Sequence, residues 1–286
     1  MTISRQSRFG LRATAVIILF FGLSGFSLET LFAPKSELWP RWQAHDATAT
    51  QTIDHGDWDM LLSAYVQSDS DGLNRFDYQN VSSADRDALR RYIDRLGKVA
   101  VGKLNRQEQL AYWINLYNAL TVDVVLTHVP VKSIRDIDIS PGFLADGPWG
   151  KKLIAVEGED LSLNDIEHRI LRPIWRDPRV HYGVNCASVG CPNLLKKAYT
   201  GAAVDRMLDV AARGYVNTAR GAKVGADGLT VSSIYVWFRD DFGGTDQAVI
   251  DHLKRYAAPD LRAALDGRSS IDAHVYDWAL NAAAGS

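Results

Sequence analysis

The sequence has few cysteines and no excess of charge of either sign. Two cysteines among 286 residues are too few for the disulfide framework that holds small secreted domains together. The 32 basic and 34 acidic side chains give a net charge of −2, so nothing in the composition indicates a nucleic-acid partner. With 47% hydrophobic and 23% charged residues, the composition excludes disordered, collagen-like and multi-span membrane classes, and the chain is long enough for a real core.

Long apolar runs are also absent, except for one near the N-terminus. Ala13–Leu23 (ATAVIILFFGL) follows three arginines, and residues 1–27 contain no acidic side chain. The run is shorter than the roughly 20 residues that a membrane-spanning helix needs. Residues 1–27 are therefore predicted to be a signal peptide, or an N-terminal membrane anchor if the run extends to Phe32. Either outcome predicts a periplasmic or otherwise exported protein, soluble or anchored, that meets the membrane only through this segment.

Residues 28–54 are predicted to be a lead-in segment, and residues 55–286 to form one domain. Prolines and many small polar side chains argue against regular structure in the lead-in segment. Its two tryptophans, Trp39 and Trp42, are expected to anchor it on the domain.

Apolar periodicity within the domain predicts helices mixed with short hairpins. Helices are expected from Trp58, from Ser83, from Asn105 to about Leu126, from about Leu163 to Arg172, over 202–219 and over 247–256, hairpins over 152–163 and 222–231, and a short strand over 179–185. This mixture has no βαβ rhythm. The predicted fold class is therefore α+β, a helix-rich single domain with a small antiparallel sheet.

The helix that begins at Asn105 has the clearest pattern. Asn105 can cap it, and Glu108 completes a capping-box sequence. Its apolar residues cover most sides, so the helix is predicted to be central. Asn115 and Asn118 lie within this apolar stripe. Because a buried amide needs hydrogen-bond partners, these two are expected to join a polar network in the core or at a site.

The densest cluster of reactive side chains extends from Glu167 to Cys191. Cys186 follows the predicted strand and precedes Ala187–Val189, which can start a helical turn. Backbone N–H groups at such a turn stabilise a thiolate and can hold an oxyanion. The pattern therefore predicts Cys186 as a nucleophile, with Asn185 and the N–H groups of this turn as oxyanion donors.

A thiol nucleophile also needs a base within hydrogen-bond reach. On a strand, His181 and Cys186 would face opposite sides and stand roughly 16 Å apart. His181 is therefore kept only as a supporting residue. His168 lies on the helix before the strand, and a short link can bring that helix beside the strand's end. We predict His168 as the base.

Other polar residues are expected to support the two catalytic ones. Neighbours on a helix point about 100° apart, so Glu167 is not expected to orient His168. Glu167 and Arg172 are instead expected to orient the helix or the substrate. The amide that orients the imidazole is expected to come from Asn115, Asn118 or Asn185.

Three alternatives use the same residues differently. In an oxidising compartment Cys186 and Cys191 can form a disulfide, since no other cysteine exists to pair with. His168 and His181 with the two cysteines can supply four zinc ligands, although their spacing matches no usual zinc module, and no metal or cofactor is predicted. The buried amides, imidazoles and carboxylates can also form a purely structural network.

Several motifs resemble the family called DUF547, a domain of unknown function found in bacteria and in plant and animal proteins. The matching runs are 105–118 (NRQEQLAYWINLYN), 163–173 (LNDIEHRILRP), 177–192 (DPRVHYGVNCASVGCP), 236–242 (VWFRDDF) and 276–281 (YDWALN). The segment 33–42 (APKSELWPRW) is similar to exported bacterial members. The resemblance implies that the family's motif positions here are Asn115, Tyr117, Asn118, Glu167, His168, Arg172, His181, Asn185, Cys186 and Cys191.

The resemblance assigns no role to these residues, so the functional prediction depends on their chemistry. A similarity to papain-like or transglutaminase-like cysteine enzymes is a further analogy, and fold analogy does not establish function. We predict an exported cysteine-dependent hydrolase or acyl transferase that acts on an amide or thioester of a small molecule or peptide. The alternative is a non-enzymatic envelope binding or scaffold domain with a Cys186–Cys191 disulfide.

Overall fold

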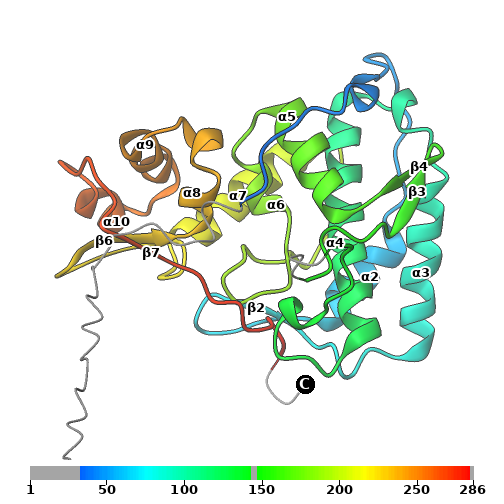
Figure 1. Cartoon of the computed structure of the whole chain (residues 1–286), viewed down its shortest axis with the longest axis horizontal. Helices are drawn as coiled ribbons and strands as arrows, with labels where there is room; N and C mark the ends of the chain where they lie inside the picture. The colour runs from blue at the N-terminus through cyan, green and yellow to red at the C-terminus, as the bar shows by residue number, and fades with distance from the viewer. Residues whose placement is uncertain (1–32, 143–146, 284–286) are drawn as a thin grey trace, which may run out of the picture.

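One long buried helix, α4 (Arg106–His128), lies at the centre of the larger part of the molecule. The computed structural model describes residues 33–142 and 147–283, and the predicted signal or anchor segment, residues 1–27, lies outside them. Every residue from Glu108 to Val122 is buried, which explains why the sequence is apolar on most sides. The helices α2 (Gly56–Tyr65) and α3 (Ser83–Gly97) pack beside it, as Figure 1 shows.

The predicted capping box at the start of α4 forms only in part. The Asn105 side chain accepts a hydrogen bond from the Glu108 N–H at 3.0 Å. The Glu108 carboxylate does not return to Asn105. It accepts from the N–H groups of Ile53 and Gly201 instead, at 2.7 and 3.1 Å. Glu108 therefore ties two distant loops to the first turn of the central helix.

A smaller second part is formed mainly by elements between residues 204 and 275. Its own apolar core includes Tyr182, Tyr215, Tyr235 and Leu253, and Figure 1 shows it to the left of the larger part. Its elements are α7 (Val204–Val216), β5 (Ala222–Gly225), β6 (Gly228–Ser232), α8 (Ile234–Trp237), η5 (Arg239–Phe242), α9 (Asp246–Tyr256), α10 (Pro259–Ala264) and β7 (Ala273–Val275). The sequence patterns predict α7, α9 and the β5–β6 hairpin, but neither α8, α10 nor β7.

The β-structure is small, so the fold is α+β as predicted. Two isolated hairpins are antiparallel, β1 (Val66–Ser68) with β2 (Asn74–Phe76) and β3 (Ile154–Val156) with β4 (Glu159–Leu161). In the three-stranded sheet, β5 and β6 are antiparallel, and β7 adds parallel to β6. The remaining short helical turns of the larger part are η1 (Pro40–Gln43), η2 (Val101–Lys103) and η3 (Ile134–Asp136).

The helix that follows β4 changes its geometry where the predicted site residues lie. Ser162 and Asp165 cap its start reciprocally, each side chain accepting from the other's N–H. Residues 163–164 are α-helical, η4 (Asp165–Leu171) is a π-helix, and α5 (Arg172–Trp175) follows without a break. The helix does not end at Arg172 as predicted, because Pro173 lies within the first turn of α5 and is tolerated there.

The lead-in segment packs along this π-helix. Pro173 has no N–H, so it cannot donate to the carbonyl of Arg169, four residues back, or of His168, five residues back. The Glu37 N–H donates to the His168 carbonyl at 2.9 Å, and the Trp39 N–H donates to the Arg169 carbonyl at 3.0 Å. Trp42 is buried against Trp113 of α4, with ring centroids 5.1 Å apart, so the expected tryptophan anchors are confirmed.

One predicted element is wrong, and it bears directly on the site. Residues 179–185 were expected to form a strand, but α6 (Val180–Gly183) is a helical turn. Asp177 begins this turn, because its carboxylate accepts from the Arg179 N–H and its carbonyl accepts from the Val180 N–H. The strand argument that His181 and Cys186 face opposite sides therefore does not apply. Across the described ranges, no helix has the length and apolarity needed to cross a membrane.

Candidate functional site

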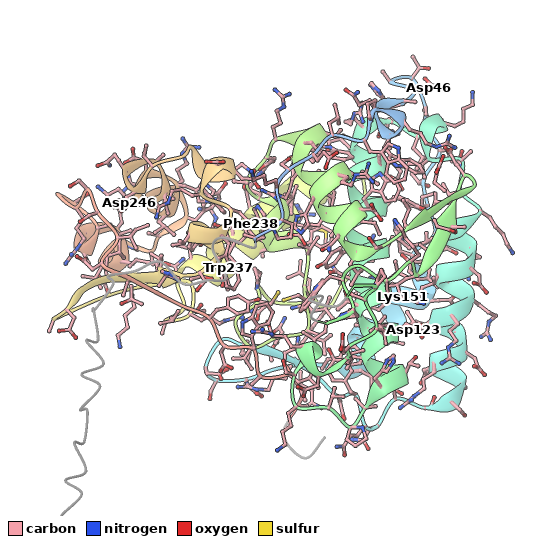
Figure 2. The ribbon with its side chains drawn as sticks, viewed as in Figure 1. Asp46, Asp123, Lys151, Trp237, Phe238 and Asp246 are labelled. Atoms are coloured by element: carbon pink, nitrogen blue, oxygen red, sulfur yellow. The ribbon has the colours of Figure 1, made fainter. Side chains whose placement is uncertain are left out.

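A cavity of about 450 Å³ lies where the larger and smaller parts meet. Figure 2 labels Trp237 and Phe238, two of its lining residues, at this junction. The lining comes from the lead-in segment, α4, η4, α6, the cysteine loop, α8 and the C-terminal segment, and it is rich in aromatic rings. It includes Pro34, Tyr117, Arg135, Trp149, Glu167, His168, His181, Cys186, Cys191, Trp237, Phe238, Tyr276 and Trp278.

The two cysteines meet in one wall of this cavity, which we call the thiol wall (Cys186, Ser188, Cys191 and Tyr276). Both thiols are free, and their sulfur atoms lie 2.7 Å apart. The Cys186 sulfur also contacts the hydroxyl oxygens of Ser188 at 3.2 Å and Tyr276 at 3.0 Å. These two hydroxyl oxygens are 2.9 Å apart. Cys186 is thus surrounded by groups that can donate hydrogen bonds to a thiolate.

Two of the predicted asparagines hold the loop that carries the cysteines. The Asn118 side chain donates to the Gly183 carbonyl and accepts from the Asn185 N–H, at 2.9 and 2.8 Å. The Asn185 side chain accepts from the Ala187 N–H and donates to the Pro192 carbonyl, at 2.9 and 2.7 Å. These bonds hold the buried Ala187 at a φ of 61°, a left-handed conformation unusual for a residue with a Cβ.

The predicted oxyanion donors have other partners in this structure. The Ala187 N–H donates to Asn185, and the Ser188 N–H donates to the Cys186 sulfur. Asn115, also predicted near the site, pairs through its amide with the N–H and carbonyl of Tyr199 at 3.0 and 2.7 Å and does not line the cavity. The donors that face the Cys186 sulfur are therefore the Ser188 N–H and the hydroxyl groups of Ser188 and Tyr276.

The two thiols differ in acidity. Burial raises the pKa of the Cys186 thiol, but hydrogen bonds from Cys191, Ser188 and Tyr276 outweigh burial and hold this pKa below its ordinary value. Burial, followed by the neighbouring Cys186, raises the pKa of Cys191 well above its ordinary value. Deprotonation of the pair therefore begins at Cys186.

A second group of polar side chains, which we call the charged wall, contains Glu167, His168 and His181, which line the cavity, and Arg172 and Asp241, which contact them from outside the lining. His181 lies between two carboxylates, with Nε2 at 2.7 Å from Asp241 and Nδ1 at 3.6 Å from Glu167. Arg172 donates to Asp241 at 2.5 Å and to Nδ1 of His168 at 3.0 Å. A second Arg172 bond, 2.8 Å long, reaches the Pro34 carbonyl of the lead-in segment.

Phe238 supports this charged wall with its ring. The ring stacks on His181 with centroids 4.6 Å apart and lies 5.6 Å from the His168 ring. The Arg172 guanidinium lies 4.6 Å from the same ring centroid, a cation–π contact. One aromatic side chain therefore fixes the orientation of three polar groups.

Charge pairing sets the protonation states of the charged wall. Burial would raise the pKa values of Glu167 and Asp241, but the neighbouring cationic side chains lower both to about 2. Burial would lower the pKa of His181, yet its bonds to the two carboxylates raise it. Burial lowers the pKa of His168 to about 4 despite the nearby Glu167. His168 is therefore neutral near pH 7 and His181 is the imidazole that favours its charged form.

The two walls share the cavity without a direct hydrogen bond between sulfur and imidazole. Among the described residues, the polar contacts of the Cys186 sulfur are Cys191, Ser188 and Tyr276, and neither His168 nor His181 is one of them. A neutral His168 that accepts from Arg172 at Nδ1 carries its proton on Nε2, which lies 4.0 Å from a Glu167 oxygen. The assignment of His168 as base stays a prediction.

The side chains of three residues at the site are not among those that the sequence patterns predict. Asp241, Ser188 and Tyr276 contact the predicted residues directly. Asp241 and Tyr276 belong to the runs VWFRDDF and YDWALN, which carried the family resemblance but suggested no chemistry. Within the described part of the chain, no group of three or more His, Cys, Asp or Glu side chains is arranged so that it could hold a metal ion. The four residues of the zinc alternative divide between the two walls.

Comparison with known proteins finds one family match, in the middle of the chain. Residues 101–216 match a family model described as "Protein of unknown function, DUF547", and this range contains α4, η4, α6 and both cysteines. No curated protein matches the chain. No solved structure matches it either, so the papain-like or transglutaminase-like analogy stays a prediction. The match confirms the resemblance that the motifs predict, and it covers the part of the chain that carries the cysteine pair.

Proposed function

We propose that the protein is a cysteine-dependent hydrolase or acyl transferase with Cys186 as its nucleophile. The single observation that carries the proposal is the position of the Cys186 sulfur, which lines the 450 Å³ cavity within hydrogen-bond distance of two hydroxyl groups. Hydroxyl donors favour the thiolate, which is the reactive form of cysteine. The thiolate can thus be populated by its own surroundings, without an imidazole in contact with the sulfur.

The proposed reaction has two steps. The Cys186 thiol gives its proton to solvent, the thiolate attacks the carbonyl carbon of an amide or thioester, the bond to the leaving group breaks, and the leaving group takes up a proton from solvent. Water or a second nucleophile then attacks the resulting thioester and loses a proton, the carbon–sulfur bond breaks, and the acyl group leaves on that nucleophile while the Cys186 thiolate is restored. Tyr276, which lies 3.0 Å from the sulfur, is suited to donate to the carbonyl oxygen.

The charged wall supports a binding role for His168. Because Arg172 occupies Nδ1, the neutral ring keeps Nε2–H as its only polar hydrogen. We assign this N–H as a hydrogen-bond donor to the substrate's carbonyl or leaving group. Glu167 and Asp241 hold His181 and Arg172 in place, which makes them positioning residues. Aromatic rings on the remaining walls suit a small molecule or peptide with an apolar group.

Acylation by a chromogenic ester tests this proposal. The reduced protein is mixed with p-nitrophenyl acetate, and released nitrophenolate is followed together with intact mass. We expect one acetyl group per chain, mapped to Cys186, in the wild type and in the matched control Cys191→Ser. The adduct should be absent in Cys186→Ser. Equal acetylation of Cys186→Ser, or no adduct on the reduced wild type, contradicts the proposal.

The alternative is a binding or scaffold domain closed by a Cys186–Cys191 disulfide. The 2.7 Å contact between the sulfurs favours it. Intact mass of the protein as isolated, before and after reductant, separates the two. A disulfide in the isolated protein together with an unreactive Cys186 after reduction would favour the scaffold.

Export is part of the proposal and depends on the N-terminal pattern of residues 1–27. Cell fractionation followed by N-terminal sequencing tests it. A mature protein in the periplasmic fraction that begins near Leu28 supports a cleaved signal, and an intact N-terminus in the membrane fraction supports an anchor. An intact protein in the cytoplasm contradicts export.

A further inference from the structure

The two thiols differ in their exposure as well as in their contacts. Cys186 is half-buried, whereas Cys191 is only 5% exposed, although both line the cavity. A molecule in the cavity therefore meets Cys186 more readily. Cys191 lies behind it, with its sulfur accepting the Cys186 N–H at 2.9 Å. This arrangement gives an outer thiol and an inner thiol.

The outer and inner thiols can join without disturbing the fold. A disulfide needs its sulfurs about 2.05 Å apart, and here they already lie at 2.7 Å. The loop between them is held by its backbone, since the N–H groups of Val189 and Gly190 donate to the carbonyls of Ala279 and Asp277 at 2.8 Å. Only a movement smaller than 1 Å separates the dithiol from the bonded pair.

The surroundings also decide which sulfur attacks first. Ser188 and Tyr276 donate to Cys186, and burial together with the neighbouring Cys186 disfavours the Cys191 thiolate. Thiol–disulfide exchange needs a thiolate that attacks and a second thiol that resolves the mixed disulfide. The outer thiol has the contacts required of the first, and the inner thiol has the position required of the second.

We propose that the pair carries a second activity, the reduction of a small disulfide that enters the cavity, with Cys186 as attacking thiol and Cys191 as resolving thiol. The Cys186 thiolate attacks one sulfur of R–S–S–R′, a bond forms between them, and R′S⁻ leaves and takes up a proton. Cys191 loses its proton and attacks the Cys186 sulfur, and RS⁻ leaves and is protonated. The substrate gains two electrons and two protons, the pair becomes a disulfide, and an external dithiol reductant restores it.

The cavity indicates the size of such a substrate. Its volume of about 450 Å³ and its aromatic walls suit a low-molecular-weight disulfide rather than a folded protein. The probe we choose is therefore cystine, a small disulfide.

The experiment follows intact mass after reduced protein is mixed with cystine. The wild type should lose two hydrogens, release two cysteines per chain and keep no adduct. Cys191→Ser should keep one cysteine adduct, mapped to Cys186 by peptide analysis. Cys186→Ser should react at least about ten times more slowly than the wild type, because its remaining thiol is buried and less acidic. Addition of dithiothreitol should return the oxidised wild type to the dithiol.

Three outcomes overturn the inference. They are a lasting adduct on the wild type, an adduct on Cys191 formed as fast as on Cys186, and an oxidised pair that dithiothreitol does not reduce in the folded protein. The wild-type mass change needs no variant, so misfolding of a serine variant does not affect the result. Acetylation of Cys191→Ser with loss of exchange would leave the proposed acyl chemistry intact, and exchange without acetylation would overturn only that chemistry.

Discussion

The two walls differ in how their polar groups are paired and in whether their protonation can change. The charged wall pairs its groups almost completely, because Glu167 and Asp241 are anionic beside Arg172 and His181. The thiol wall contains neutral donors and two sulfurs whose protonation and bonding can change. The comparison indicates that the charged wall is a fixed frame and the thiol wall is the reactive part.

The largest expected effect is a loss of acylation rate when the thiol wall loses its Cys186 sulfur. Cys186→Ser should lower the rate of acylation by at least about 1,000-fold, because a serine hydroxyl is not ionised near neutral pH. Its unfolding free energy should change little, since the side chains are similar in size. Rates with p-nitrophenyl acetate and urea unfolding check both parts. Comparable rates for the two proteins would move the reactive centre away from the thiol wall.

Removal of one charge from the charged wall should lower the free energy of unfolding of the protein. Arg172→Met removes the guanidinium from its buried ion pair with Asp241, which should cost about 3–5 kcal/mol. Urea unfolding measures the loss, and Arg172→Lys, which keeps the charge, should recover part of it. If Arg172→Met is as stable as the wild type, the charged wall is not the fixed frame that we infer.

Acid should weaken the charged wall in two stages. The lowered pKa of His168, about 4, means that the unfolded chain binds a proton first as pH falls below about 6.5, so stability falls between about 6.5 and 4. The lowered pKa values of Glu167 and Asp241, about 2, add a second loss below about pH 4.5. His168→Gln should reduce the slope of the first stage only, as measured by urea unfolding at each pH, because His55 and His252 also have pKa values lowered to about 4. An unchanged slope between pH 6.5 and 4 would show that His168 is not buried in its neutral form.

A proline in the lead-in segment tests what supports the π-helix from outside. Glu37→Pro removes the N–H that donates to the His168 carbonyl, and an unsatisfied buried carbonyl should cost about 1–3 kcal/mol. Glu37→Ala keeps the N–H and is the matched control, with near wild-type stability. Equal urea midpoints for the two variants would mean that water replaces the lost donor.

The smallest expected effect concerns the hydroxyl beside the sulfur. Tyr276→Phe removes a donor to Cys186, so the thiol pKa should rise and its reaction with iodoacetamide at pH 6 should slow by about 3- to 10-fold. Ser188→Ala should slow it further when combined with Tyr276→Phe. A Tyr276→Phe rate that matches the wild type would assign the lowered pKa of Cys186 to Cys191 and Ser188.

The sequence patterns predict the central helix better than the contacts of the site residues. The helix from Asn105 was predicted because many apolar residues recur at helical spacing, and the buried Asn118 was expected to find partners, which it does at Gly183 and Asn185. The turn 180–183 was predicted as strand, because four residues are too few to show a helical period. The clustering of both cysteines with the two histidines around one cavity could be proposed from spacing, but not their contacts.

Other features leave no local pattern to detect. Asp241 reaches Arg172 and His181 from 69 and 60 positions away along the chain, so only the tertiary fold brings them together. The π-helix over Asp165–Leu171 leaves no signal in the hydrophobic periodicity of the sequence. The partners of Cys186 depend on the C-terminal segment that brings Tyr276 to the sulfur.

The contact between the lead-in segment and the π-helix changes what counts as the functional unit. A fragment cut at residue 55, where regular structure begins, would lack Pro34 of the cavity lining and the backbone donors of Glu37 and Trp39. It would also leave Arg172 without its Pro34 partner. Such a fragment would keep all five members of the charged wall but lose the backbone contacts of the lead-in segment with the π-helix and Arg172. For this protein, the segment that follows the predicted export signal is therefore a structural part of the pocket and not a spacer.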